Sequence, residues 1–301
     1  MRPIRLFLLA LALGVPALAQ PLVLTSNPVL QDLVRQVGGD NFRVECLVPP
    51  GIRSPDFEPS PADGQRLHDA ALLVVNGAGY EPWLGGVLKQ SNYDAPVSIA
   101  SQGLALLDYD GNWLEPGEDG MVNASPTDLD PYAWHDPRNV VHYVENIRGA
   151  LTSLMPARVG EFRNRAAAYI RQLQALHTYA LEQLGAIPPA RRRLVTPMNN
   201  FQYLAAAYGL KIVPIPGLAS GQELRPAVLE HMVNGIAQLH VPAVFFEATA
   251  NPRTLKRISD ETGTKTIASL YPEGLGPPGS PAASCLGMLR ANIDTIARAL
   301  K

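Results

Sequence analysis

Polar and aromatic side chains that could bind a ligand gather in four short segments of this sequence. Each segment lies where an apolar run ends and a helical pattern begins, at 49–59, 130–137, 196–204 and 270–276. Carboxylate, phenol, imidazole and amide groups occur in them, and such groups hold ions and small polar solutes. In open α/β sheets, ligands bind at the ends of the strands that precede helices. The sequence therefore predicts a binding site built from these four segments.

Signatures of catalysis are poor by comparison. The turn at 77–82 follows an apolar run and opens a helix, but Pro82 stands where a dinucleotide-binding turn has its third glycine. The sequence has no G-x-S-x-G elbow, phosphate-binding loop, H-E-x-x-H helix or C-x-x-C pair. We therefore expect a binding protein, not an enzyme.

Length and composition favour a folded protein of two lobes. The chain has 301 residues, of which 47% are hydrophobic and 17% charged. Domains hold roughly 100 to 200 residues, so each half is large enough to bury a core. Lys plus Arg number 25 and Asp plus Glu 27, with no run of like charge. This balance excludes the basic surface that nucleic-acid binding needs, so we expect no nucleic-acid partner.

Strands alternate with helices in both halves, which indicates parallel βαβ units because parallel strands need a crossover connection. In the first half, the apolar runs and helical patterns predict strands at 22–25, 43–48, 71–76 and 97–100, and helices at 28–37, 62–69 and 82–90. In the second half, strands are expected at 194–196, 211–214, 244–247 and 265–270, and helices at 200–208, 226–238, 252–262 and 283–300. The segment 108–130 has no periodicity and is expected to be a surface loop. The fold class is α/β, with a parallel four-stranded sheet flanked by helices in each lobe.

One long helix is predicted between the two halves. Apolar residues recur at spacings of three and four over 157–184, and Gly185 followed by two prolines ends the pattern. A helix of this length spans about 40 Å, the size of a lobe, and would make a stiff joint. We expect an N-terminal lobe at 20–156, a linking helix at 157–185 and a C-terminal lobe at 186–301.

The first 19 residues have the pattern of an export signal. Arg2 and Arg5 precede a short apolar run, and Ala17 and Ala19 provide small residues for cleavage. We expect a mature chain that is periplasmic or secreted and soluble. Residue 20 is Gln and not Cys, so we expect no lipid anchor. Export would permit a disulfide between Cys46 and Cys285, although two small buried thiols are the simpler interpretation.

The mature chain resembles the solute-binding receptors of zinc and manganese ABC importers, the TroA-like proteins. The residues that carry the resemblance keep the family's order along nearly the whole chain: Thr25-Ser26-Asn27-Pro28, Gly38-Gly39-Asp40, Val48-Pro49-Pro50-Gly51, Phe57-Glu58-Pro59, Asn76-Gly77, Glu81-Pro82-Trp83-Leu84, the turn at 134–137, Tyr203-Leu204, Tyr208-Gly209-Leu210 and Phe246-Glu247. The resemblance implies two α/β lobes joined by a rigid helix, with a metal ion between the lobes.

The family's usual histidine ligands are replaced in this chain. Its motifs D-P-H-x-F-E-P, D-P-H-x-W-x-D-P and H-D-A-F-G-Y-L place histidine where Pro55, Tyr132 and Met198 stand here. The fourth ligand of the family is an Asp, and Glu273 occupies that place. Proline offers no side-chain donor, neutral phenol is a poor ligand, and a thioether suits Cu(I). By resemblance, Glu273, Tyr132 and Met198 line the metal site.

Neighbouring residues could restore a ligand set. Asp56 follows Pro55, and His135 lies three residues after Tyr132. Asp56, His135 and Glu273 would then form an oxygen-rich site with one imidazole. Two other interpretations stay open, namely that Asp56 caps its turn and that His135 lies exposed outside the cleft. Met198 could likewise serve only as apolar filling.

Arginines near the expected cleft raise another hypothesis. Arg53 stands where the family often has an acid, and Arg225 precedes a helix. Guanidinium groups there would favour an anion or an anionic chelate over a bare cation, unless both are ordinary surface residues. The remaining histidines are expected to be surface or partly packed residues: His68, His142, His177, His231 and His240.

These observations predict a solute-binding protein of a metal-ion ABC transporter. It would act as a monomer, bind zinc or manganese as its transported ligand, need no organic cofactor, and deliver the ligand to a membrane permease. The alternative is a divergent member of the family that has lost free-metal binding and acts as an accessory protein or as a chelate- or anion-binding protein.

Overall fold

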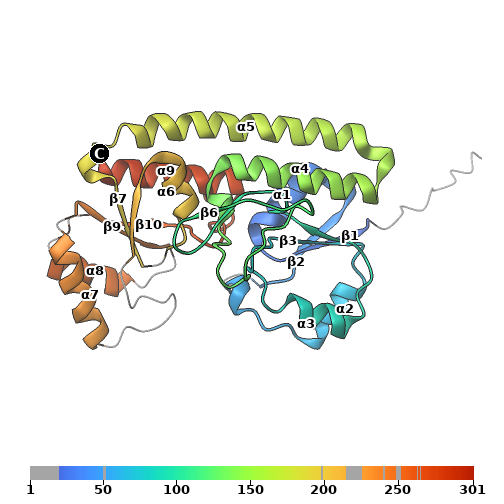
Figure 1. The fold of residues 1–301 in the computed structure, drawn as a ribbon, viewed down its shortest axis with the longest axis horizontal. Coiled ribbons are helices and arrows are strands. Elements are labelled where there is room, and N and C mark those ends of the chain that lie inside the picture. Colours follow the sequence, from blue (N-terminus) through green and yellow to red (C-terminus); the bar gives the residue numbers. More distant parts are fainter. Residues whose placement is uncertain are drawn as a thin grey trace, which may run out of the picture.

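The computed structural model shows two lobes lying side by side under one long helix (Figure 1). It describes residues 20–49, 52–197, 199–214, 226–239, 241–248, 252–262, 264 and 266–301. The predicted export signal, Met198, Arg225 and His240 lie outside the described residues.

The first lobe is built on a parallel sheet in the order β2-β1-β3-β4. Its strands are β1 (Leu22–Thr25), β2 (Arg43–Cys46), β3 (Leu72–Val75) and β4 (Val97–Ile99). All residues of β1 and β3 are buried, as expected for central strands covered on both faces. The predicted four-stranded sheet is confirmed in this lobe.

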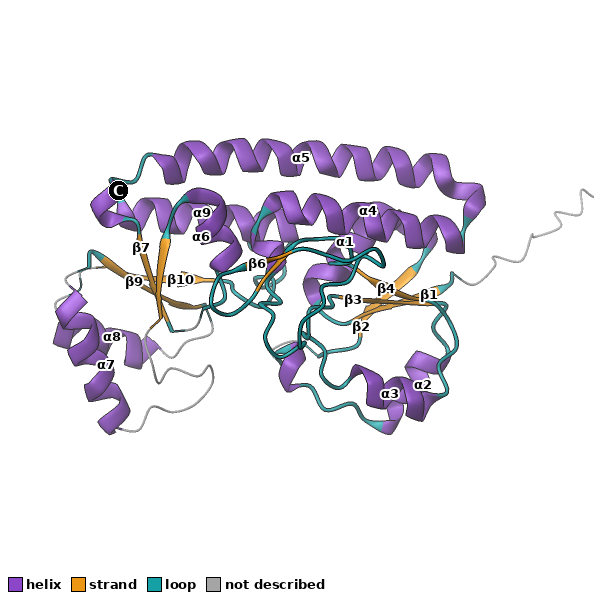
Figure 2. Cartoon of the chain, in the orientation of Figure 1, coloured by secondary structure: helices purple, strands orange, loops and turns teal. Residues whose placement is uncertain are grey.

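Helices cover both faces of this sheet (Figure 2). Successive residues of β1 and β3 belong alternately to two apolar clusters, one on each face of the sheet. One cluster includes residues of α1 (Pro28–Gly38) and α4 (Pro137–Leu154). The other includes residues of α2 (Pro61–His68) and α3 (Leu84–Ser91). The sequence prediction omitted α4. Its start is marked by Asp136, whose side chain accepts a hydrogen bond from the Arg138 amide and caps the helix.

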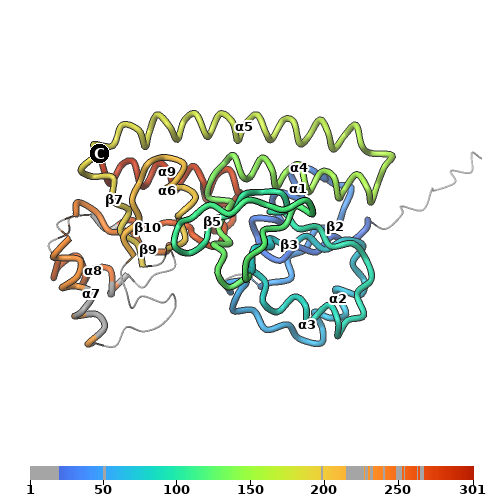
Figure 3. The backbone as a smooth tube through the Cα atoms, viewed as in Figure 1, coloured from blue at the N-terminus to red at the C-terminus, as the bar shows by residue number. Residues whose placement is uncertain are grey.

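A short hairpin occurs in the region expected to be a loop. Strands β5 (Leu106–Leu107) and β6 (Trp113–Leu114) pair antiparallel, and the hairpin reaches the second lobe (Figure 3). The Tyr203 hydroxyl accepts a hydrogen bond from the Leu107 amide at 2.9 Å, and the Trp113 ring packs edge-on against Tyr203. The prediction of an irregular loop at 108–130 is therefore wrong at β6, because a two-residue strand has no detectable period.

The glycine-rich turn after β3 has a structural explanation. Gly79 has a φ of +75°, and a Cβ atom there would lie 2.1 Å from the Pro126 carbonyl oxygen. Only glycine tolerates both the left-handed backbone and the close approach. The glycine thus serves chain packing.

The second lobe contains two parallel strand pairs. Strand β7 (Arg193–Thr196) pairs with β8 (Lys211–Pro214), and β9 (Ala243–Glu247) pairs with β10 (Thr266–Leu270). The predicted strands and their parallel direction are confirmed, whereas among the described residues their hydrogen bonds form two pairs and no continuous four-stranded sheet. The helices of this lobe are α6 (Gln202–Tyr208), α7 (Pro226–Leu239), α8 (Pro252–Thr262) and α9 (Cys285–Leu300).

Helix α5 (Val159–Gly185) runs above both lobes and packs on α4 and α9 (Figure 1). Its buried face is the predicted apolar stripe of Phe162, Ala166, Tyr169, Leu173, Leu176, Ala180 and Leu184. These residues belong to one apolar cluster that includes residues of both lobes, so the helix joins the lobes through packing as well as through the chain. The exact lobe boundaries at 156 and 186 stay a prediction.

Among the residues that the structure describes, five short segments form 3-10 helices: η1 (Gly39–Asn41), η2 (Ser54–Asp56), η3 (Ala133–His135), η4 (Pro156–Arg158) and η5 (Pro189–Arg191). None of the helices in the described part of the chain is both long and apolar enough to span a bilayer.

Candidate functional site

The carboxylate of Glu273 is the centre of a polar cluster where the lobes meet. Its Oε1 atom accepts three hydrogen bonds, from Arg53 Nη1 at 3.1 Å, Tyr132 OH at 2.9 Å and Asn200 Nδ2 at 3.1 Å. Its Oε2 atom is buried and has no hydrogen-bond partner among the described residues. Burial of the side chain raises the pKa of Glu273, and Arg53 opposes this rise. One oxygen is therefore saturated with donors while the other is unpaired.

Arg53 connects this carboxylate to Asp56. Its Nε lies 2.6 Å from Asp56 Oδ2 and its Nη2 lies 3.1 Å from Oδ1, which is a two-point guanidinium–carboxylate pair. The pair lowers the pKa of Asp56 and raises that of Arg53. Asp56 is thus linked to Glu273 through one guanidinium, which carries a positive charge at any ordinary pH.

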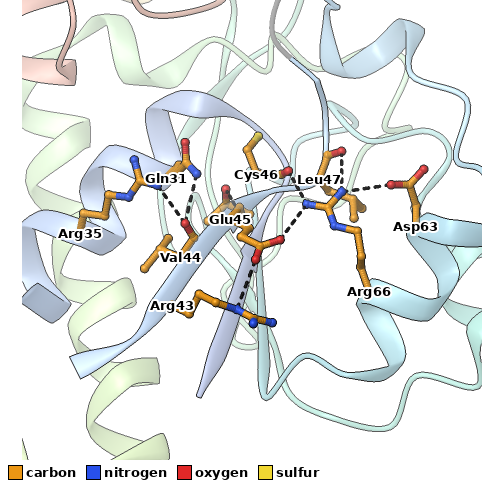
Figure 4. Close-up of polar contacts among 10 residues, drawn as sticks. Gln31, Arg35, Arg43, Val44, Glu45, Cys46, Leu47, Asp63 and Arg66 are labelled. Carbon is orange, nitrogen blue, oxygen red and sulfur yellow. Dashed lines mark hydrogen bonds and ion pairs between the residues drawn. The ribbon is translucent and has the colours of Figure 1, made fainter. Parts of the chain in front are cut away.

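A salt-bridge cluster lies beside the end of β2 (Figure 4). Arg66 on α2 donates hydrogen bonds to the carbonyl oxygens of Cys46, the last residue of β2, at 2.8 Å and of Leu47 at 3.4 Å. It also pairs with Glu45 at 3.3 Å and with Asp63 at 3.1 Å. These bonds hold the carboxyl end of β2 against α2.

The turn carrying Arg53 and Asp56 is fixed from its other side by Trp83. The indole Nε1 donates to the Ser54 carbonyl oxygen at 2.8 Å, and Phe57 packs edge-on against the indole ring at 5.2 Å. Pro55 lies within η2, where its ring favours the turn, and its side chain has no atom that could bind a metal ion.

Tyr132 is held by aromatic and backbone contacts. Asn76 donates a hydrogen bond from Nδ2 to the Pro131 carbonyl oxygen at 2.9 Å, and the Tyr80 ring packs edge-on against Tyr132 at 5.8 Å. Burial, reinforced by the nearby Glu273 charge, raises the pKa of the Tyr132 phenol far above its usual value. Tyr132 therefore remains a neutral donor to Glu273 and does not act as a phenolate.

His135 lies inside the molecule, against the backbone of the residue that precedes Glu273. It is fully buried, and its Nε2 lies 2.7 Å from the Pro272 carbonyl oxygen. A carbonyl only accepts, so Nε2 carries the proton and Nδ1 is bare. Burial lowers the pKa of His135 to about 4. The hypothesis of an exposed His135 is wrong, because its ring also packs on Phe201 of the second lobe at 4.5 Å.

We expect His135 to make folding sensitive to acid. Its pKa is near 6.5 unfolded and about 4 folded, so between these values the unfolded state binds more protons and stability falls as pH falls. The free energy of unfolding should fall by about 2 kcal/mol between pH 7 and pH 5 through His135 alone.

Burial raises the pKa of Asp130 and of Glu81 to about 7, which acts in the opposite direction. The test therefore compares wild type with His135→Gln by urea denaturation at both pH values. The difference in free energy of unfolding between wild type and His135→Gln should be about 2 kcal/mol smaller at pH 5 than at pH 7. An equal difference at both pH values would contradict the low pKa of His135.

The other predicted site residues are distributed as follows. Tyr132 and Glu273 are in direct contact, Asp56 reaches Glu273 through Arg53, and Met198 lies outside the described residues. No group of three or more His, Cys, Asp and Glu side chains suited to a metal ion is found in the described ranges. Cys46 and Cys285 are free thiols, so the alternative of a disulfide is wrong.

Sequence reasoning missed the part played by Asn200. It lies in the third polar segment, between β7 and α6, and 3% of its surface is exposed. Asparagine just before a short helix usually indicates a cap, so its type alone did not distinguish it from a structural residue.

The sequence model of the ZnuA family, described as zinc-uptake complex component A, periplasmic, matches residues 23–299. The chain belongs to this family. Among its relatives, the manganese-binding lipoprotein MntA of Halalkalibacterium halodurans is 31% identical over 278 residues, covering 92% of this chain and 88% of MntA. The iron-binding protein YfeA of Yersinia pestis is 31% identical over 276 residues, covering 92% and 85%.

Solved structures agree with this assignment. The periplasmic zinc-binding protein TroA of Treponema pallidum matches with a TM-score of 0.78 at 25% identity, covering 94% of this chain and 99% of TroA. The resemblance and the fold class predicted from the sequence are thus confirmed. As a ZnuA-family member, the chain is a solute-binding protein of a metal-ion ABC transporter, as predicted.

The expectation of a soluble chain without a lipid anchor is wrong by these comparisons. The relatives MntA, FimA of Streptococcus parasanguinis and PsaA of Streptococcus pneumoniae are named lipoproteins. That expectation depended on the residue type at one assumed cleavage position, next to a leader that lies outside the described residues.

Proposed function

We propose that this ZnuA-family protein binds a divalent transition metal ion at the seam between its lobes and delivers it to the permease. The ion would take the place that the Arg53 guanidinium occupies between Asp56 and Glu273. The relatives are named for manganese, iron and zinc, which supports this class of cargo. The alternative of a member without metal binding is not favoured by these relatives.

The observation that carries the proposal is the unpaired Oε2 atom of Glu273. Leaving a buried acceptor without a partner costs about 1 to 3 kcal/mol, and more when the acceptor is charged. The side chain is 8% exposed, so water compensates little of this cost. An ion coordinated by both oxygens of the Glu273 carboxylate would give Oε2 a partner and remove this penalty.

Charge and donor chemistry indicate which ions would bind. Asp56 and Glu273 together carry two negative charges, which match one divalent ion once the guanidinium has left. The other metal-donor oxygens at the seam would be the amide oxygen of Asn200 and water, because the Tyr132 hydroxyl stays protonated and donates to Glu273. Oxygen donors suit Mn²⁺ and Fe²⁺, whereas zinc sites draw mainly on imidazole and thiolate.

The other predicted ligands receive different parts in this proposal. His135 positions Glu273, because its Nε2 is engaged by the Pro272 carbonyl next to that residue. Tyr132 holds the Glu273 carboxylate through its hydroxyl. Met198 remains a predicted ligand that supplies a thioether to softer ions.

We further propose that the chain acts as a monomer without catalytic activity and without a nucleic-acid partner. The near-neutral balance of 25 basic and 27 acidic residues supports the last point. The family's assignment to uptake supports a permease as the protein partner.

Calorimetric titration of the metal-stripped mature chain with Mn²⁺, Fe²⁺, Zn²⁺ and Cu⁺ tests the proposal. We expect one Mn²⁺ per chain with a dissociation constant below about 1 µM, which corresponds to about 8 kcal/mol. Zn²⁺ normally binds more tightly than Mn²⁺, and with oxygen donors we expect its advantage to stay under about ten-fold. Dissociation constants weaker than 1 µM for all four ions would refute metal binding at this seam.

A further inference from the structure

The ion pair between Arg53 and Glu273 joins the two lobes. Arg53 precedes η2 in the first lobe, and Glu273 follows β10 in the second, 220 residues later in the chain. The guanidinium lies between two carboxylates, within 3.1 Å of Glu273 and 2.6 Å of Asp56. It therefore lies between the negative charges of Asp56 and Glu273.

The two ends of this pair differ in how far they are buried. The Glu273 side chain is 8% exposed, that of Arg53 27% and that of Asp56 56%. Exposure thus rises from the second-lobe carboxylate towards Asp56, and the arginine reaches inward from the solvent side. Arg53 is therefore open to solvent in part, whereas Glu273 is almost wholly enclosed.

A metal ion and the guanidinium exclude each other at this position. An arginine side chain has only donors and stays protonated, so it cannot become a ligand. Without a cation, Glu273 would be a buried negative charge with hydrogen bonds but no opposite charge beside it, which is unfavourable. In the empty protein Arg53 supplies that partner, and in the loaded protein the metal ion does.

From this geometry, and resting on the proposed function, we infer that Arg53 is an internal competitor of the cargo. It neutralises Glu273 and draws the lobes together when no metal is bound, and it must leave before an ion can bind. Arg53 thereby lowers the affinity for the cargo. It favours doubly charged ions, because these attract the carboxylates more strongly than the single charge of a guanidinium does. It is a residue that determines specificity and is not a ligand.

The test measures Mn²⁺ affinity by calorimetry in wild type, Arg53→Gln and Arg66→Gln. Arg66 is the matched control, since it is also a half-buried, ion-paired arginine of the first lobe but binds Glu45 and Asp63. We expect Arg53→Gln to bind Mn²⁺ at least about ten-fold more tightly, a gain of about 1.4 kcal/mol. Arg66→Gln should stay within about two-fold of wild type.

A second measurement follows lobe separation by small-angle scattering of the metal-free proteins. Arg53→Gln should be more open than wild type when empty, and equal to it when loaded with Mn²⁺. If Arg53→Gln does not fold, Arg53→Lys replaces it, because an ammonium cannot bridge both carboxylates in the same way, and a smaller gain in affinity is expected.

The outcomes separate this inference from the proposed function. If wild type binds Mn²⁺ and Arg53→Gln binds it with equal or weaker affinity, the inference about Arg53 is wrong while the proposed function stands. Absence of Mn²⁺ binding in wild type and in both arginine variants would overturn the proposed function, and the inference with it. Equal lobe separation in the empty proteins would show that Arg53 does not draw the lobes together.

Discussion

Glu273→Gln should weaken Mn²⁺ binding by about 100-fold or more, the largest functional effect expected from any single change in this chain. The amide keeps the volume of the side chain and an oxygen for the bonds from Tyr132 and Asn200. It removes the charge and replaces the unpaired Oε2 by an NH₂ group, which cannot coordinate a cation. Calorimetry on the metal-stripped protein measures the change.

Glu45→Gln is the control for this experiment. Glu45 also forms an ion pair with an arginine, but it does so with Arg66 beside β2, away from the seam. Its loss should leave Mn²⁺ affinity within about two-fold of wild type. Equal weakening in both variants would mean that net charge, and not coordination by Glu273, governs the affinity. Full affinity in Glu273→Gln would place the metal elsewhere.

The fold could be predicted from the sequence because its elements have local causes. Helix α5 follows from an apolar stripe that faces one core, and β1 and β3 follow from apolar runs buried on both faces. The predicted ends of helices and strands differ from the observed ends by one or two residues at most, because capping contacts determine where an element stops. Helix α4 is the larger omission, although Asp136-Pro137 provides a start signal that could have identified it.

The site could be predicted only in part, because its contacts depend on how the lobes meet. Resemblance led to Tyr132 and Glu273, and these two residues do form a hydrogen bond. The direction of His135 could not be read from a three-residue spacing, since its partner is a backbone oxygen of the other lobe. The same holds for Arg53, whose pairing with Glu273 spans 220 residues of sequence.

The second large effect concerns Glu81, a buried carboxylate that holds the turn after β3. Its Oε1 accepts hydrogen bonds from the Ser26 hydroxyl and from the Asn76 amide at 2.8 Å, and its Oε2 accepts one from the Gly77 amide at 3.0 Å. Asn76 in turn donates to the Pro131 carbonyl oxygen, which lies next to Tyr132. Glu81 therefore supports both the first lobe and the placement of the phenol that holds Glu273.

Glu81→Ala should lower the free energy of unfolding by about 3 to 5 kcal/mol, because it leaves two backbone amides and one hydroxyl buried without acceptors. Ser26→Ala removes only one of these bonds and should cost about 1 kcal/mol. Urea denaturation measures both losses. If the turn transmits its position to Tyr132, Glu81→Ala should also weaken Mn²⁺ binding under conditions where the variant remains folded, whereas Ser26→Ala should not. A folded Glu81→Ala protein with wild-type affinity would show that the seam is positioned independently of this turn, through the contacts of Glu273 within the second lobe.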